Sequence, residues 1–117
     1  MRRIDKPWGY ELIFAETDRY VGKRIHIRAG HRLSLQYHAV KDETIFVEAG
    51  ELELELVEAG ISQKMQLRPD ESRHIAPGVI HRMSAVTDVD IIEVSTPELA
   101  DVVRLEDDYG RAGTSTP

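Results

Sequence analysis

The sequence predicts a single all-β domain, folded as a sandwich or a barrel. Three observations carry this prediction: a strictly alternating run, a series of short strand-like segments, and turn residues between them. The alternating run is Glu51-Leu52-Glu53-Leu54-Glu55-Leu56. Successive side chains of a strand point to opposite faces, so this run is typical of a half-buried strand with its leucines inward.

Eight further segments have the length and residue types of strands. They occupy residues 10–14, 20–27, 33–38, 43–49, 63–67, 72–75, 81–86 and 90–95. The dipeptides Ala29-Gly30, Ala49-Gly50, Ala59-Gly60, Pro69-Asp70 and Pro77-Gly78 separate them as turn signals. Short strands at this spacing indicate a sandwich or barrel. We expect a hairpin at Ala49-Gly50 and a short helix over residues 97–103, because Pro97 suits a helix start.

Composition narrows the class of protein. The chain has 117 residues, a net charge of −6 and no cysteine, which excludes disulfides, thiolate metal sites and a cysteine nucleophile. Its acidity argues against nucleic acid as a partner. No apolar run approaches the ~18 residues of a membrane span, and no signal-peptide core follows Met1, so we expect no membrane partner and a cytoplasmic location.

The charge is unevenly spread along one domain. Residues 1–50 carry 9 basic and 7 acidic side chains, whereas residues 51–117 carry 6 and 14. The first half therefore suits a local cationic site for an anionic small molecule. We expect residues 1–111 to form the domain with a C-terminal arm, and the small, polar residues 112–117 to be a flexible tail.

Strand alternation assigns faces to several polar side chains. Glu43 is in phase with Ile45 and Val47, so we expect it to point inward. Lys23 is likewise in phase with apolar neighbours, and a buried ammonium is costly unless it meets an anion. Another expected apolar face, which a second subunit would cover in a homodimer, consists of Leu33, Leu35 and Tyr37.

One constellation suits a metal ion. Gln36 and His38 lie on the same side of a predicted strand, Glu43 begins the next, and His81 follows the Pro77-Gly78 turn. An amide oxygen, two imidazoles and a carboxylate suit zinc, manganese, iron, cobalt or nickel. Four protein ligands would leave positions open for a substrate. No further potential metal ligands accompany His26, His31 and His74, which are interpreted as surface or turn residues.

These residues also resemble a known family. Gly30, Gln36-Tyr37-His38, Glu43 and Gly50 follow the spacing of the first cupin motif, and Pro77-Gly78-Val79-Ile80-His81 follows the core of the second. The resemblance implies a single-domain cupin, a double-stranded β-helix or jelly-roll barrel. Residues 6–9, 21–25, 32–38, 92–94 and 103–111 further resemble the C-terminal cupin domain of type II mannose-6-phosphate isomerases, in which a glutamine replaces the first cupin histidine.

The narrower resemblance implies a function. The chain would be a metal-dependent isomerase interconverting aldose and ketose phosphates through a metal-stabilised enediol(ate), with a sugar phosphate as its small-molecule substrate. A divalent ion, zinc as first choice, would be held by Gln36, His38, Glu43 and His81. Lys23 and Lys41 would bind an anion or transfer a proton. Lys41 keeps the charge of a functional arginine of the family, but not its planar fork.

Other interpretations stay open from the sequence. The family's His- and Arg-rich stretch is replaced here by Ala39-Val40-Lys41-Asp42. A non-catalytic metal-binding cupin that holds a sugar or small acid is one alternative, and another cupin enzyme, such as a nucleotide-sugar epimerase, is a second. Tyr109 and Arg111 either close over the barrel, contact a neighbouring subunit, or form a surface arm.

Overall fold

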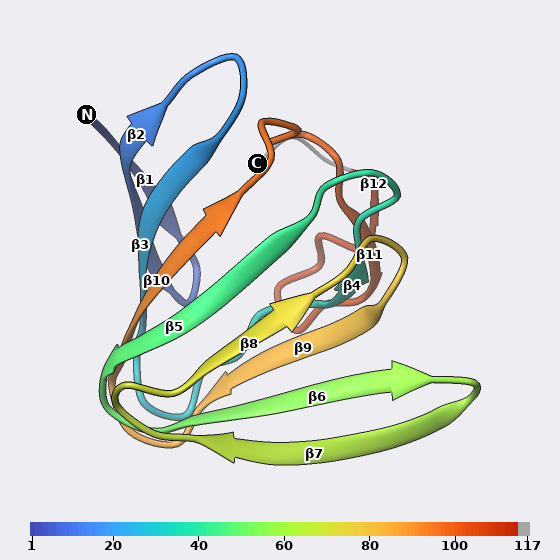
Figure 1. Ribbon diagram of the computed structural model, residues 1–117. Coiled ribbons are helices and arrows are strands. Elements are labelled where there is room, and N and C mark those ends of the chain that lie inside the picture. Colours follow the sequence, from blue (N-terminus) through green and yellow to red (C-terminus); the bar gives the residue numbers. More distant parts are fainter. Residues whose placement is uncertain (115–117) are drawn as a thin grey trace.

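The chain forms two six-stranded antiparallel sheets that face each other (Figure 1). The computed structural model describes residues 1–114. In spatial order, the first sheet contains β1 (Arg2–Lys6), β2 (Gly9–Glu16), β3 (Val21–Ile27), β10 (Val89–Ser95), β5 (Glu43–Ala49) and β8 (Ser72–Ile75). The second sheet contains β12 (Gly113–Thr114), β11 (Val103–Glu106), β4 (Leu35–Tyr37), β9 (Ile80–Ala85), β6 (Leu52–Glu58) and β7 (Ile61–Leu67).

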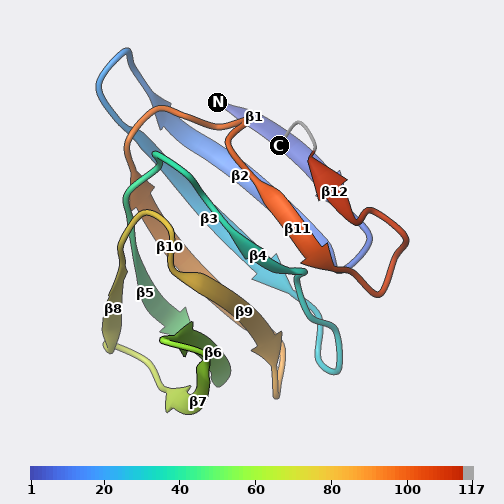
Figure 2. The same cartoon turned by 90° about the vertical axis from the view of Figure 1, so that its right-hand side faces the viewer.

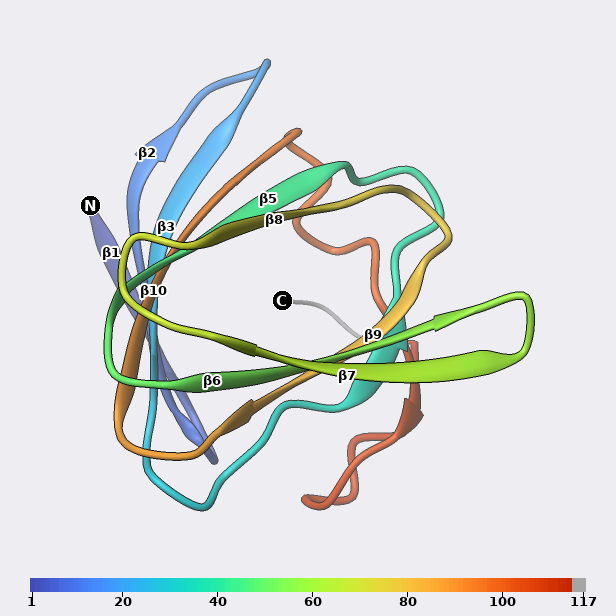
Figure 3. The ribbon, with the colours of Figure 1, turned by 60° about the horizontal axis from the view of Figure 1, so that its bottom comes forward.

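The predicted all-β class is confirmed. Each of the nine predicted strands corresponds to an observed one, and the inward leucines of β6, Leu52, Leu54 and Leu56, are buried. They belong to one hydrophobic core with Val47 of β5 and Ile91 of β10, so both sheets contribute to it. Figure 3 shows this arrangement, with β5 and β10 on one side of the interior and β6 and β9 on the other.

The expected hairpin at Ala49-Gly50 is wrong. β5 pairs with β10 and β8 in the first sheet, whereas β6 pairs with β7 and β9 in the second, so the chain crosses between sheets at Gly50. Gly50 has a φ of 85°, and a Cβ there would lie 2.0 Å from the carbonyl oxygen of Asp88. The glycine is therefore required by close backbone packing at this corner.

The C-terminal arm also differs from expectation. Residues 97–102 form turns and irregular backbone instead of a helix, and Val103 begins β11. Gly113 and Thr114 of the predicted tail pair with β11 as β12. Residues 115–117 of that tail lie outside the described residues. β1, β11 and β12 were not predicted, since these strands are short and none alternates between apolar and polar residues for more than four positions.

The expected outer face of Leu33, Leu35 and Tyr37 is divided in the structure. Leu33 is buried in the core, whereas Leu35 and Tyr37 are half-buried. Arg32 forms an isolated β-bridge with Ser84, and β4 begins only at Leu35. Residues 33 and 34 are therefore not part of the strand, and the inward–outward alternation of β4 does not extend back to Leu33. Leu33 therefore cannot contribute to a dimer surface. Within residues 1–114, no helix is long and apolar enough to cross a membrane.

Candidate metal centre and its pocket

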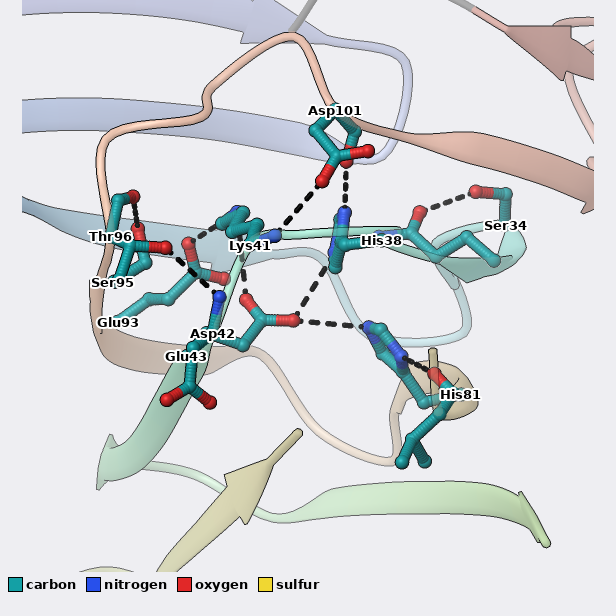
Figure 4. Close-up of polar contacts among 12 residues, drawn as sticks. Ser34, His38, Lys41, Asp42, Glu43, His81, Glu93, Ser95, Thr96 and Asp101 are labelled. Carbon is teal, nitrogen blue, oxygen red and sulfur yellow. Dashed lines mark hydrogen bonds and ion pairs between the residues drawn. The ribbon is translucent and has the colours of Figure 1, made fainter. Parts of the chain in front are cut away.

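Two histidines and one glutamate converge between the sheets, and we call them the His–Glu cluster: His38, Glu43 and His81. His38 follows β4, Glu43 begins β5 in the opposite sheet, and His81 lies on β9. One nitrogen or oxygen atom from each side chain lies within 4.8 Å of the others. All three are buried, and Figure 4 shows them pointing toward one another.

Backbone carbonyls fix both imidazole rings. His38 donates from Nδ1 to the carbonyl oxygen of Asp101, and His81 donates from Nδ1 to that of Val79 over 2.9 Å. Because a carbonyl can only accept, both Nδ1 atoms carry the hydrogen in the neutral rings. The two Nε2 atoms then present lone pairs toward Glu43 Oε1, at 3.2 and 3.3 Å. This is the orientation that a metal-ligating histidine needs.

The cluster has more acceptor atoms than donors. Both carboxylate oxygens of Glu43 and Nε2 of His81 are buried without a hydrogen-bond partner in the described chain. Each such atom costs about 1–3 kcal/mol when left unsatisfied. A divalent cation would satisfy imidazole nitrogens and a carboxylate together, so the residues present fit a metal ion.

The fourth predicted ligand, Gln36, lies beside the cluster. It is paired with His81 across β4 and β9, and its Nε2 is 3.4 Å from Nε2 of His38. Its Oε1 accepts a hydrogen bond from Ser34 over 2.6 Å. A 180° rotation of the amide would turn the oxygen toward His38. The structure thus brings together the side chains predicted to bind the metal.

Next to the cluster lies a second buried group, which we call the lysine–carboxylate network: Glu11, Lys23, Lys41 and Glu93. Lys23 Nζ lies 3.1 Å from Glu11 Oε1 and 3.5 Å from Glu93 Oε2. Lys41 Nζ lies 3.1 Å from Glu93 Oε2 and 3.6 Å from Glu43 Oε2. The anion that Lys23 requires is therefore supplied by the chain itself.

The network shifts the acidity of its members. Burial opposes the charge on Lys23, but Glu93 and Glu11 raise its pKa above the ordinary value. Burial and the neighbouring Glu43 charge raise the pKa of Glu93. Sequence reasoning missed Glu11 and Glu93, although both are in phase with buried apolar neighbours, Ile13 and Ile91, as Lys23 is.

Asp101 holds the loop between His38 and Glu43. Its carboxylate accepts hydrogen bonds from the backbone N–H groups of Ala39, Val40 and Lys41, at 3.1, 2.7 and 2.9 Å. Burial alone would raise its pKa, but these donors hold the pKa below its ordinary value. Through its backbone carbonyl it also orients His38. No pattern in the sequence indicates this role, because Asp101 lies in the segment expected to be a helix.

A pocket opens beside both groups. It is partly open to solvent, its volume is about 50 Å³, and its lining includes Gln36, His38, Lys41 and Glu93. Three further cations, which we call the mouth cations, also line it: Lys6, Arg104 and Arg111. The C-terminal arm closes over its own barrel here, since Tyr109 packs on the core and its hydroxyl is 2.8 Å from Nδ1 of His31.

The remaining histidines lie away from the cluster. His26 Nδ1 is 2.8 Å from Asp90 Oδ1, and its ring stacks on Tyr10. His74 is exposed, with Nε2 2.6 Å from Asp42 Oδ1. Neither belongs to the group of possible metal ligands found within residues 1–114.

Two facing antiparallel sheets with a buried His–Glu cluster inside them define a cupin, a class that commonly binds metal ions. Residues 1–107 match the family model described as "Mannose-6-phosphate isomerase C-terminal". The chain belongs to this family.

Curated relatives agree with this assignment. The chain is 32% identical over 115 residues to the xanthan biosynthesis protein XanB of Xanthomonas campestris pv. campestris, covering 94% of this chain and 24% of that protein. It is 36% identical over 116 residues to the mannose-1-phosphate guanylyltransferase ManC of Salmonella typhimurium, covering 94% and 23%. The chain thus spans about a quarter of the length of these relatives.

Solved structures share the fold at lower identity. KdgF from Halomonas sp. superposes with a TM-score of 0.72 at 22% identity, covering 83% of this chain and 88% of that one. Oxalate decarboxylase from Bacillus subtilis gives a TM-score of 0.75 at 17% identity, covering 88% and 29%. These similarities confirm the double-stranded β-helix fold.

Proposed function

We propose that the chain is a metal-dependent sugar-phosphate isomerase of the mannose-6-phosphate type. The observation that carries the proposal is the convergence of His38, Glu43 and His81 with their lone pairs facing one another in a buried, unsatisfied cluster. Family membership supports the choice of a phosphorylated sugar as substrate. His38, Glu43 and His81, with Gln36 beside them, would hold the divalent ion.

The bound cation would polarise a substrate oxygen and stabilise the negative charge that develops when a C–H proton is removed. The chain's own residues supply the proton transfer. Glu93 lines the pocket, and its carboxylate is the base that carries the proton between C1 and C2 of the open-chain sugar. Lys41 Nζ, 3.1 Å from Glu93 Oε2, donates a hydrogen bond to the substrate oxygen. Lys23 holds Glu93 from the other side and positions it.

The experiment is a coupled assay of zinc-loaded protein with mannose 6-phosphate and with fructose 6-phosphate. We expect turnover in both directions, and incorporation of solvent deuterium at the carbon that exchanges its proton. Glu93→Gln is expected to lower kcat by about 10²–10⁴-fold, as for removal of a general base. Glu48→Gln, an exposed change on the same sheet, is the matched control. No turnover by protein that contains its metal would refute the isomerase.

A direct role of Lys23 in anion binding has its own test. If folded Lys23→Met binds mannose 6-phosphate as tightly as the unaltered protein, Lys23 does not touch the ligand. A weaker Kd with unchanged metal content supports the role.

A second candidate function is a metal-binding cupin that holds a small acid without turnover. The volume of the pocket, about 50 Å³, favours it, because a small acid needs less room than a sugar phosphate. Titration with malonate and with mannose 6-phosphate separates the two candidates. Tighter binding of malonate, together with no isomerase turnover, would favour the non-catalytic protein.

A further inference from the structure

The pocket carries a positive charge that the rest of the protein does not. Five cations line it, namely Lys6, Lys23, Lys41, Arg104 and Arg111, against two carboxylates, Glu11 and Glu93. The formal excess is three positive charges in a chain whose net charge is −6. Lys23 and Lys41 are neutralised within the lysine–carboxylate network, and Arg111 is paired with Asp107 outside the lining, so the uncompensated charge resides at Lys6 and Arg104.

Arg104 is the least satisfied of these cations. Its residue is 7% exposed, and its Nε and one terminal nitrogen are buried without a hydrogen-bond partner in the described chain. Burial and the neighbouring Arg111 charge lower the pKa of Arg104. An unpaired buried guanidinium destabilises a protein unless an anion reaches it.

The other two mouth cations, Lys6 and Arg111, differ in whether a carboxylate holds them. Lys6 is half-buried and has no carboxylate partner within ion-pair distance among residues 1–114. Burial lowers its pKa, the Glu11 charge opposes that shift, and the Arg104 charge adds to it. Arg111 is held by Asp107 through two contacts of 3.0 and 2.9 Å. Arg111 is thus fixed in place, whereas Lys6 and Arg104 keep donors free for a ligand.

The strand register fixes how far this site lies from the His–Glu cluster. Arg104 on β11 is paired with Gln36 on β4, and Gln36 is paired with His81 on β9. Directly opposed residues point to the same face, and neighbouring strands lie ~4.8 Å apart. The Cα atoms of Arg104 and His81 are therefore about 10 Å apart, on one face. Figure 2 shows β11, β4 and β9 in this order.

We infer that Lys6 and Arg104, with Arg111 beside them, bind the phosphate group of a phosphorylated sugar whose reactive end lies at the His–Glu cluster. The inference rests on the proposed function for the reactive end, and adds where the anionic end is held. An arginine fork matches the oxygens of a phosphate group, and a lysine adds a compact charge. The separation suits an anion several bonds from the reacting carbons.

The test is calorimetric titration of inorganic phosphate, and then of mannose 6-phosphate, into zinc-loaded protein freed of excess zinc. Arg104→Gln and Lys6→Gln are the test variants, and Arg2→Gln is the control, because Arg2 lies on β1 with Lys6 but pairs with Glu16 at the surface. We expect Arg104→Gln to weaken binding at least ~10-fold with unchanged zinc content, Lys6→Gln to weaken it less, and Arg2→Gln to leave it unchanged. Removing an unpaired buried charge should not lower the melting temperature of ligand-free Arg104→Gln.

The outcomes separate this inference from the proposed function. Equal affinity of Arg104→Gln, Lys6→Gln and unaltered protein would overturn the inference. So would loss of phosphate binding in Glu43→Gln but not in Arg104→Gln, because the anion would then bind at the metal. An Arg104-dependent Kd without isomerase turnover would support the anion site and refute only the isomerase.

Discussion

The His–Glu cluster and the lysine–carboxylate network are neighbours, are both buried, and satisfy their polar atoms in different ways. In the network, Lys23 lies within 3.5 Å of Glu11 and Glu93, and Lys41 lies 3.1 Å from Glu93, so two ammonium groups balance two carboxylates. In the cluster, two imidazole lone pairs face a carboxylate that has no hydrogen-bond donor. Burial of a polar side chain therefore does not by itself indicate a ligand site. Burial combined with unsatisfied acceptors does.

The largest expected effect concerns the network. Lys23→Met should lower the free energy of unfolding by about 3–5 kcal/mol, because it leaves Glu11 and Glu93 buried with too few cations. Urea unfolding measures this. Arg24→Met, which removes the next cation on β3 from an exposed pair with Glu48, should cost less than ~1 kcal/mol. A Lys23→Met protein as stable as Arg24→Met would show that the network does not stabilise the fold.

A smaller effect on stability, together with a loss of metal affinity, is expected in the cluster. Glu43→Gln should weaken zinc binding at least ~100-fold, about 2.7 kcal/mol, because a neutral amide replaces the central carboxylate. Without metal, the variant should be modestly less stable than the original chain, because Lys41 loses one of its two carboxylate partners. Competition with a zinc-binding dye gives the affinity. Glu48→Gln on the same strand is the control, and equal zinc affinity of the two variants would contradict the ligand assignment.

The smallest effect concerns Asp101, which holds the loop that connects His38 of the cluster to Lys41 of the network. Asp101→Asn should weaken zinc binding about 10-fold, within the range of outer-shell changes. The loop of Ala39 to Lys41 loses a carboxylate acceptor, so the backbone carbonyl of Asp101 that orients His38 is held less firmly against it. Asp90→Asn, a change at the His26 contact outside the pocket, is the matched control. An unchanged zinc affinity in Asp101→Asn would mean that the cluster is held by β4, β5 and β9 alone.

The difference between local strand geometry and long-range packing explains which features the sequence could predict. Period-two alternation located nine strands and placed Lys23 and Glu43 on inward faces, because a strand fixes side-chain direction locally. The same rule, applied to β2 and β10, would have found Glu11 and Glu93. Motif spacing brought Gln36, His38, Glu43 and His81 to one place.

The remainder depends on long-range packing. Gly50 looks like a hairpin turn, but whether a strand folds back or crosses to the other sheet depends on which partners compete for its edge. Asp101 acts through three backbone donors that lie about sixty positions earlier in the chain. Arg104 becomes part of the pocket only because β11 pairs with β4. None of these contacts leaves a pattern within a short window of sequence.

Zinc binding by the purified chain tests the central claim most directly. The protein is stripped with a chelator, titrated with zinc, and followed by elemental analysis and by its melting temperature. We expect one ion per chain and a melting temperature that rises with zinc and falls again on chelation, because the ion binds only the folded cluster. A chain that retains no divalent ion and melts at the same temperature with zinc and with chelator would contradict the account.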